Sequence, residues 1–181
     1  QLAQHIREHT GRLDLLVNNA SRFFPTQVGT TTMAQWDALM DSNLRGPYFL
    51  TQALLPELST AGGSVINLLD IHAARPMADH AVYCMAKAGL QMMTLALAKD
   101  LGPKIRVNGV APGAILWPEH EADADYQQNI LNRTVMKRAG TPQDIASAVT
   151  YLGLDAPYVT GQVLAVEGGR SLNASPPLCS T

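Results

Sequence analysis

The sequence has little charge and no excess of basic residues. Charged residues make up 15% of the 181 residues, where about 25% is usual. Hydrophobic residues make up 46%, a balance that excludes disorder over most of the length. The formal net charge of −2 excludes the basic field that nucleic-acid binding requires. No uninterrupted apolar run approaches the ~18 residues that span a bilayer, so we expect neither nucleic acid nor a membrane as a partner.

Cysteine is also scarce. The two cysteines, Cys84 and Cys179, lie far apart in the sequence and provide no metal-binding framework. We therefore expect no metal site. A reducing compartment suits two isolated thiols, which favours a cytoplasmic location, although a single disulfide between them stays open at this point.

Strand-like and helix-like segments alternate along the chain. Apolar runs without period-two alternation cover residues 13–17, 62–69, 105–110 and 162–166. Segments with helical periodicity cover residues 2–9, 32–58, 80–101 and 142–152, with a bend expected at Gly46-Pro47. This order predicts an α/β fold in which helices cover both faces of a parallel sheet.

Candidate site residues follow the predicted strands, because open parallel sheets bind ligands beyond the carboxyl ends of their strands. The first strand is followed by Asn18-Asn19-Ala20-Ser21, the second by Asp70 and the third by Pro112-Gly113. The first segment is also typical of an Asx-type turn, and an aspartate such as Asp70 is usually a helix cap or turn residue. In a closed pocket, a carboxyl group can instead take part in proton transfer.

The helix predicted after Asp70 carries Tyr83 and Lys87. These residues share one helix face because they lie four positions apart. A free tyrosine has a pKa of about 10, which is too high for efficient proton transfer at pH 7. Because a nearby ammonium favours the phenolate, the pair predicts a lowered pKa for Tyr83 and a role in proton transfer. A chance pairing is the alternative.

Further motifs occur in a fixed order around this pair. They are Asn43 in Ser42-Asn43-Leu44, the run Asn108-Gly109-Val110-Ala111-Pro112-Gly113, and Gly161-Gln162 before the last strand. With Asn18-Asn19-Ala20-Ser21 and Tyr83-x-x-x-Lys87, they resemble the short-chain dehydrogenase/reductase family from about residue 13 to residue 170. The resemblance implies a three-layer Rossmann-like domain over residues 1–170, a C-terminal tail over 171–181, and a homotetramer.

Asp70 stands where this family normally has a serine. This departure, together with Phe23 after the first strand, Arg75-Pro76, and the run from Gly113 to Glu119, is similar to the pteridine reductases, most of all to their bacterial branch. The resemblance implies NADPH-dependent reduction of pterins (biopterin or dihydrobiopterin, and folates as further candidates). Hydride transfer would be coupled to a proton relay through Tyr83 and Asp70.

The resemblance also assigns the site residues. Catalytic roles fall to Asp70, Tyr83, Lys87 and Asn43. Cofactor contacts fall to Asn18, Ala20, Ser21, Lys87, Pro112 and Gly113. Substrate contacts fall to Ser21, Phe23, Asp70, Tyr83 and Trp117. In this scheme Lys87 holds the nicotinamide ribose, Asn43 positions Lys87 through a water, and Phe23 stacks on the pterin. Structural roles are the alternatives: a helix bend for Asn43, core or lid packing for Phe23, and a buried position for Trp117.

The glycine-rich turn that cradles the cofactor pyrophosphate in this family has no counterpart here. No G-x-G-x-x-G occurs, and the chain begins with Gln1. Relative to the family, about 70 residues in two βαβ units are missing, so we expect an N-terminally truncated domain and read it as part of a longer enzyme. Two functional alternatives stay open: a short-chain reductase for a carbonyl compound, and a catalytically inactive binding module.

Overall fold

The computed structural model describes residues 2–117 and 124–173. The expectations for Cys179, for Pro118-Glu119 and for most of the 171–181 tail lie outside the described residues. The start of that tail, up to Asn173, belongs to a 3₁₀ turn over Arg170–Asn173, which crosses the boundary predicted at residue 170.

The centre of the molecule is a parallel four-stranded sheet with strand order β1-β2-β3-β4. The strands are β1 (Leu15–Asn18), β2 (Ser64–Leu68), β3 (Arg106–Pro112) and β4 (Val163–Val166). Leu15 pairs with Ser64, and Ser64 in turn with Arg106. All four predicted strands are therefore confirmed, and they lie next to one another in the order in which they occur in the chain.

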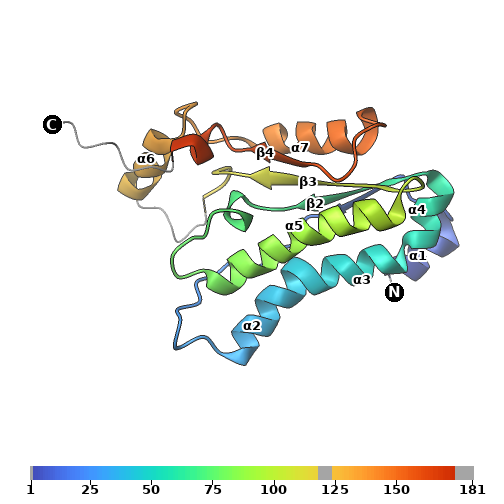
Figure 1. Ribbon diagram of the computed structural model, residues 1–181, viewed down its shortest axis with the longest axis horizontal. Coiled ribbons are helices and arrows are strands. Elements are labelled where there is room, and N and C mark those ends of the chain that lie inside the picture. Colours follow the sequence, from blue (N-terminus) through green and yellow to red (C-terminus); the bar gives the residue numbers. More distant parts are fainter. Residues whose placement is uncertain (1, 118–123, 174–181) are drawn as a thin grey trace.

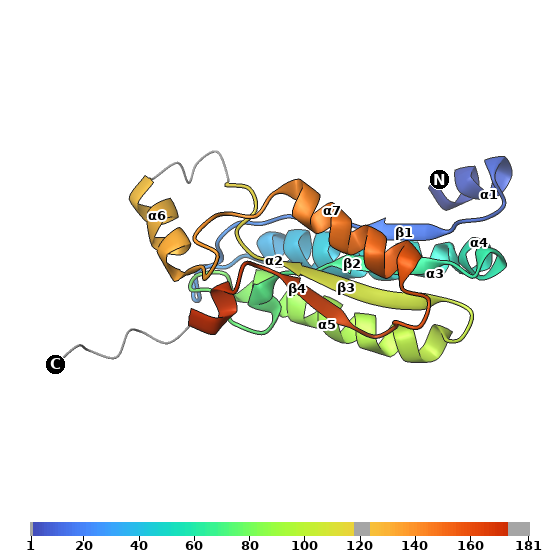
Figure 2. The same ribbon diagram turned by 90° about the horizontal axis from the view of Figure 1, so that it is seen from above.

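Helices cover both faces of this sheet (Figures 1 and 2). They are α1 (Leu2–His9), α2 (Met33–Met40), α3 (Gly46–Ala53), α4 (Leu55–Ala61), α5 (Ala81–Leu101), α6 (Ala124–Arg133) and α7 (Pro142–Thr150). On one face Val65 packs with Leu54 and Ala98, from the α3–α4 junction and α5. On the other face Ile66 packs with Ala148 of α7. Neighbouring residues of β2 thus enter two separate cores, which confirms the predicted three-layer architecture.

The long helix predicted over 32–58 is broken into shorter pieces. Asp41–Arg45 forms a π-helical turn between α2 and α3, in which the Gly46 amide donates to the Asp41 carbonyl. Pro47 explains the break, because proline has no N–H to donate and its ring clashes with the carbonyl four residues earlier. A wider turn removes both conflicts and places Asn43, which is 1% exposed, inside the protein.

Helix α5 is 21 residues long and contains an 18-residue window with a mean hydropathy of 1.3, so by length and composition it is capable of crossing a membrane. Its buried residues include Leu90 and Met93, which pack against Leu69 and Ala111 at the ends of β2 and β3. Core packing therefore accounts for the apolar character of this helix.

Candidate active site

Asp70 lies two residues after the end of β2, and its two carboxylate oxygens have different partners. Oδ1 accepts a hydrogen bond from the His72 backbone amide at 2.8 Å, which caps the 3₁₀ turn Ile71–Ala73. Oδ2 accepts a hydrogen bond from the Tyr83 hydroxyl at 2.7 Å. The capping role and the predicted contact with Tyr83 are thus both present, and the cap fixes the carboxylate in place for the phenol.

Tyr83 and Lys87 lie in the first two turns of α5, with exposed fractions of 4% and 3%. The Lys87 ammonium donates to the carbonyl of Leu68, the last residue of β2, at 2.8 Å. Its Nζ atom lies 5.7 Å from the centroid of the Tyr83 ring. The structure therefore brings Asp70, Tyr83 and Lys87 together at the carboxyl end of β2.

The pKa of Tyr83 is shifted in the direction opposite to the prediction. Burial raises the pKa of Tyr83, and the charge of Asp70 and its hydrogen bond raise it further. The predicted lowering of the Tyr83 pKa by Lys87 is wrong, because the nearest charged group is the Asp70 carboxylate, while the ammonium is held at the Leu68 carbonyl. Tyr83 is accordingly a protonated phenol, which is the state that donates a proton in a reduction.

Lys87 should leave a measurable mark on the pH dependence of stability. Burial lowers the pKa of Lys87 from 10.5 to about 8. Between these values the unfolded chain binds a proton that the folded chain does not, so the free energy of unfolding should rise with pH from about 8, by about 1 kcal/mol per pH unit. The window closes near pH 10, where unfolded tyrosine ionises but buried Tyr83 does not.

Urea unfolding at pH 8, 9 and 10 tests this pH dependence. Lys87→Met should abolish the rise, whereas Lys104→Met, at an exposed lysine just after α5, should retain it. An equal slope in the wild type and in Lys87→Met would contradict the assignment.

Phe23 lies beside Tyr83. Its ring is 40% exposed, contacts the Tyr83 ring edge-on with centroids 4.9 Å apart, and stacks on the ring of His80 at 4.7 Å. A cavity of about 190 Å³ adjoins these groups. Its lining includes the predicted residues Phe23, Asp70, Tyr83, Gly113 and Trp117. The structure therefore gathers five of the predicted residues, from four separate segments, around one cavity.

Other predicted residues have structural hydrogen bonds. The Asn18 side chain donates to Asn67 Oδ1 at 2.8 Å and to the Thr51 hydroxyl at 3.3 Å, which links β1 to β2 and α3. The Ser21 hydroxyl donates to Asn43 Oδ1 at 2.6 Å.

Asn43 is tied to two further groups. Its amide nitrogen donates to the backbone carbonyls of Arg22 and Leu39, each at 2.9 Å. Asn43 thus holds the loop after β1 in place, and its predicted water-mediated link to Lys87 stays a prediction. Ala20 is exposed in the same loop.

The residues around Lys87 fit a nicotinamide ribose. An ammonium has three N–H donors, and within residues 2–117 and 124–173 only the bond to Leu68 uses one of them. Two donors remain for ribose hydroxyls.

Gly113 lies at the end of β3, next to Pro112, where an added Cβ would lie 2.7 Å from Glu167 Cβ. Close packing of β3 on β4 thus explains this glycine.

His72, Tyr126 and Arg170 also line the cavity, and they are not among the site residues predicted from the sequence. Arg170 lies beyond the carboxyl end of β4, which is where open parallel sheets bind ligands. The residues after the fourth predicted strand were therefore candidates on the same ground as those after the first three. Tyr126 belongs to α6, whose sequence carries no comparable signal. In the part of the chain that the structure describes, no cluster of three or more His, Cys, Asp or Glu side chains is placed to hold a metal.

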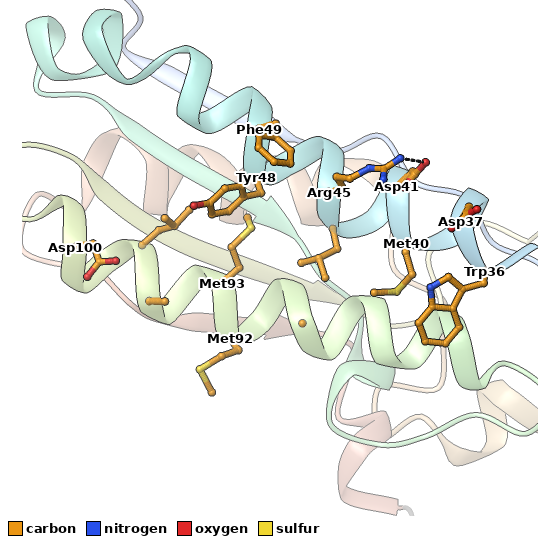
Figure 3. Close-up of a pocket in the computed structure, with 14 residues that line it drawn as sticks. Trp36, Asp37, Met40, Asp41, Arg45, Tyr48, Phe49, Met92, Met93 and Asp100 are labelled. Atoms are coloured by element: carbon orange, nitrogen blue, oxygen red, sulfur yellow. Dashed lines mark hydrogen bonds and ion pairs between the residues drawn. The ribbon is translucent and has the colours of Figure 1, made fainter. Parts of the chain in front are cut away.

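A larger cavity, of about 610 Å³, lies between the α2–α3 segment and α5. Trp36, Met40 and Tyr48 line it from the α2–α3 segment, and Met93 lines it from α5 (Figure 3). Its lining lacks Asp70 and Tyr83. Because a hydrogen-bonded acid and phenol meet only at the smaller of the two cavities, we take the smaller cavity as the candidate active site.

Comparison with known proteins decides the family. The sequence profile of the family described as enoyl-(acyl carrier protein) reductase matches residues 1–171. The chain is a short-chain dehydrogenase/reductase. The crystal structure of a Sinorhizobium meliloti protein assigned as a short-chain alcohol dehydrogenase superimposes with a TM-score of 0.89 at 30% identity, over 95% of this chain and 71% of that one. A short-chain dehydrogenase/reductase of Brucella melitensis, titled glucose/ribitol dehydrogenase, gives a TM-score of 0.83 at 31% identity, over 93% of this chain and 68% of that one.

Curated relatives of this short-chain dehydrogenase/reductase include a ketoacyl reductase and dihydromonapterin reductases. A Streptomyces violaceoruber protein assigned as ketoacyl reductase 2 of the granaticin polyketide synthase is 39% identical, over 91% of this chain and 69% of the relative. The dihydromonapterin reductase of an Enterobacter species is 34% identical, over 96% of this chain and 72% of the relative. The dihydromonapterin reductase of Citrobacter koseri is 35% identical, over 94% of this chain and 71% of the relative. Membership in the family makes the protein an oxidoreductase that uses a nicotinamide cofactor.

Proposed function

We propose that the protein is an NADPH-dependent pteridine reductase that acts on oxidised pterins or dihydropterins. The observation that carries the proposal is the 2.7 Å hydrogen bond from the Tyr83 hydroxyl to Asp70, in a cavity that Phe23 also lines. A carboxylate suits a pterin edge, because that edge presents N–H donors as well as ring nitrogens. The dihydromonapterin reductases among the relatives, at 34% and 35% identity, support a pterin as the substrate class.

The reaction adds a hydride to carbon and a proton to nitrogen of one C=N bond. The bound cofactor supplies the hydride. We assign the proton to the Tyr83 hydroxyl, which is protonated because its pKa is raised. Asp70 lies within hydrogen-bond distance of the same oxygen, so it can return a proton from solvent to Tyr83 after transfer. Lys87 would hold the ribose, and Phe23 and Trp117 would enclose the heterocycle.

A reductase for carbonyl compounds is the second candidate, because a ketoacyl reductase is 39% identical to this chain. Steady-state rates with dihydrobiopterin and with a panel of ketones and ketoacyl thioesters separate the two. We expect turnover of the pterin. Turnover of the carbonyl compounds alone would refute the pterin assignment, and failure to bind NADPH or turn over either class would favour a binding module.

The groove shown in Figure 3 supports self-association. Apolar side chains line it, with Tyr48 and Phe49 from α3 and Met92 from α5, and all three are exposed. We propose that a second copy of the chain covers this groove within a cytoplasmic homotetramer. Two copies related by a two-fold axis would bury these exposed side chains against each other, because the same patch of both chains faces the axis. Sedimentation equilibrium should give the mass of four chains, and a monomer mass would contradict the proposal.

A further inference from the structure

Arg170 places a positive charge on the wall of the active-site cavity. It follows β4, after Gly168 and Gly169, which adopt positive φ angles of 63° and 76°. Its side chain is partly buried and lines the same cavity as Asp70 and Tyr83. Neither Asn43 nor Lys87, to which the resemblance gives catalytic roles, lines this cavity.

The guanidinium of Arg170 has no hydrogen-bond or ion-pair partner within residues 2–117 and 124–173. The nearest acid in the sequence, Glu167, accepts hydrogen bonds from the Ser171 amide and hydroxyl instead. By contrast Arg7, Arg12, Arg45 and Arg138 all pair with carboxylates. Arg170 thus combines partial burial with five N–H donors that no described residue uses.

The chemistry of a guanidinium defines what would satisfy it. Its planar fork matches a carboxylate or a phosphate, with two parallel charge-assisted hydrogen bonds. Such a group bound in the cavity would neutralise the charge of Arg170. The negative charge of Asp70 would repel this carboxylate or phosphate, so the anion would bind away from the catalytic end of the cavity.

The sheet topology separates the two segments that carry these charges. Asp70 follows β2 and Arg170 follows β4, with β3 between them. Neighbouring strands lie about 4.8 Å apart, so the ends of β2 and β4 are about 10 Å apart. A bicyclic heterocycle that contacts Asp70 would therefore extend a side chain past Gly113, at the end of β3, toward Arg170.

We propose that Arg170 is a specificity-determining residue that binds a carboxylate or phosphate on the side chain of the substrate. This inference rests on the proposed pteridine reductase function and narrows it to pterins with an anionic substituent. The catalytic end of the cavity would recognise the ring, and Arg170 would discriminate between side chains.

The test compares three dihydropterins in wild type, Arg170→Met and Arg170→Lys. Dihydrofolate carries carboxylates, dihydroneopterin monophosphate carries a phosphate, and dihydrobiopterin has an uncharged side chain. Arg170→Met should lower kcat/KM about 10- to 100-fold for the anionic substrates that Arg170 binds, and should leave dihydrobiopterin within about twofold. Arg170→Lys should retain part of the preference for the anionic substrates over dihydrobiopterin. Comparison of dihydrofolate with the phosphate ester shows which anion the site takes.

A binding measurement separates this inference from the proposed function. The protein has two tryptophans, so Trp36→Phe leaves Trp117, in the cavity wall, as the fluorescent reporter of pterin binding. In this background Kd should be lower for an anionic than for the neutral dihydropterin, and the difference should shrink as salt is added. This result does not depend on turnover. A wild type that binds pterins with this preference but reduces none of them would therefore refute the proposed reductase function and leave the inference about Arg170 standing.

Arg138→Met is the matched control, because Arg138 is exposed, pairs with Asp144 at 3.3 Å and does not line the cavity. It should leave the preference among the three dihydropterins unchanged. Equal affinities of the wild type for anionic and neutral dihydropterins, or an equal loss for both in Arg170→Met, would overturn the inference.

Discussion

Replacing Tyr83 with phenylalanine is expected to lower kcat for a dihydropterin by about 10²- to 10⁴-fold, the range that a positioned proton donor contributes. The ring that packs beside Phe23 is kept. What is lost is the hydroxyl proton, which burial and the adjacent carboxylate keep on the oxygen by raising the pKa of Tyr83. Because the variant has no hydroxyl at this position, solvent would have to protonate the substrate.

Single-turnover kinetics with preformed substrate complex measure this loss directly. Tyr151→Phe is the matched control, since Tyr151 is exposed in the turn after α7 and should retain the wild-type rate. A Tyr83→Phe variant whose rate stays within threefold of wild type would show that another group delivers the proton.

Asp70→Ala is expected to abolish measurable pterin turnover. The substitution removes both the acceptor of the Tyr83 hydroxyl and the cap on the His72 amide, so the phenol loses its orientation and the turn after β2 loses its anchor. A helix-cap loss alone costs about 1 kcal/mol of stability, which circular dichroism melting would register separately from the kinetic effect.

Two further variants separate the charge of Asp70 from its geometry. Asp70→Asn keeps an oxygen for the His72 amide and removes the negative charge, which should lower the pKa of Tyr83. Asp70→Ser introduces the residue that the family normally carries. Pterin turnover at the wild-type rate in either variant would contradict a relay through the carboxylate, whereas loss in both with an unchanged melting temperature would support it.

The four strands and the meeting of Asp70 with Tyr83 follow from local rules. Apolar runs without alternation mark buried parallel strands, and strand ends gather at one edge of such a sheet. Position in the sequence therefore places Asp70 next to the first turns of α5. Lys87 follows from helical spacing alone, because four residues bring it back to the same face as Tyr83.

Those local rules do not predict whether the pKa of Tyr83 is raised or lowered. The direction depends on which charged atom lies nearest to one oxygen, and the helix places the ammonium against the Leu68 carbonyl instead. The end of β1 also differs from the prediction, whereas the cofactor contact predicted for Asn18 stays a prediction. Asn18 is the last residue of β1 and not the first of the loop, so its side chain bonds across to Asn67 in the neighbouring strand.

The π turn at Asp41–Arg45 has a geometric consequence for comparisons among related enzymes. One additional residue per turn rotates all that follows by about 100° relative to an unbroken helix. Deleting a single position there would restore a regular α-helix, which would keep Pro47 and Thr51, both buried, on the same face but would remove the wider turn that holds Asn43. Chain length at this bend, more than side-chain identity, would then decide whether Asn43 can reach the Ser21 loop. Homologues aligned with a one-residue gap at this bend are those in which that loop must be anchored by some other group.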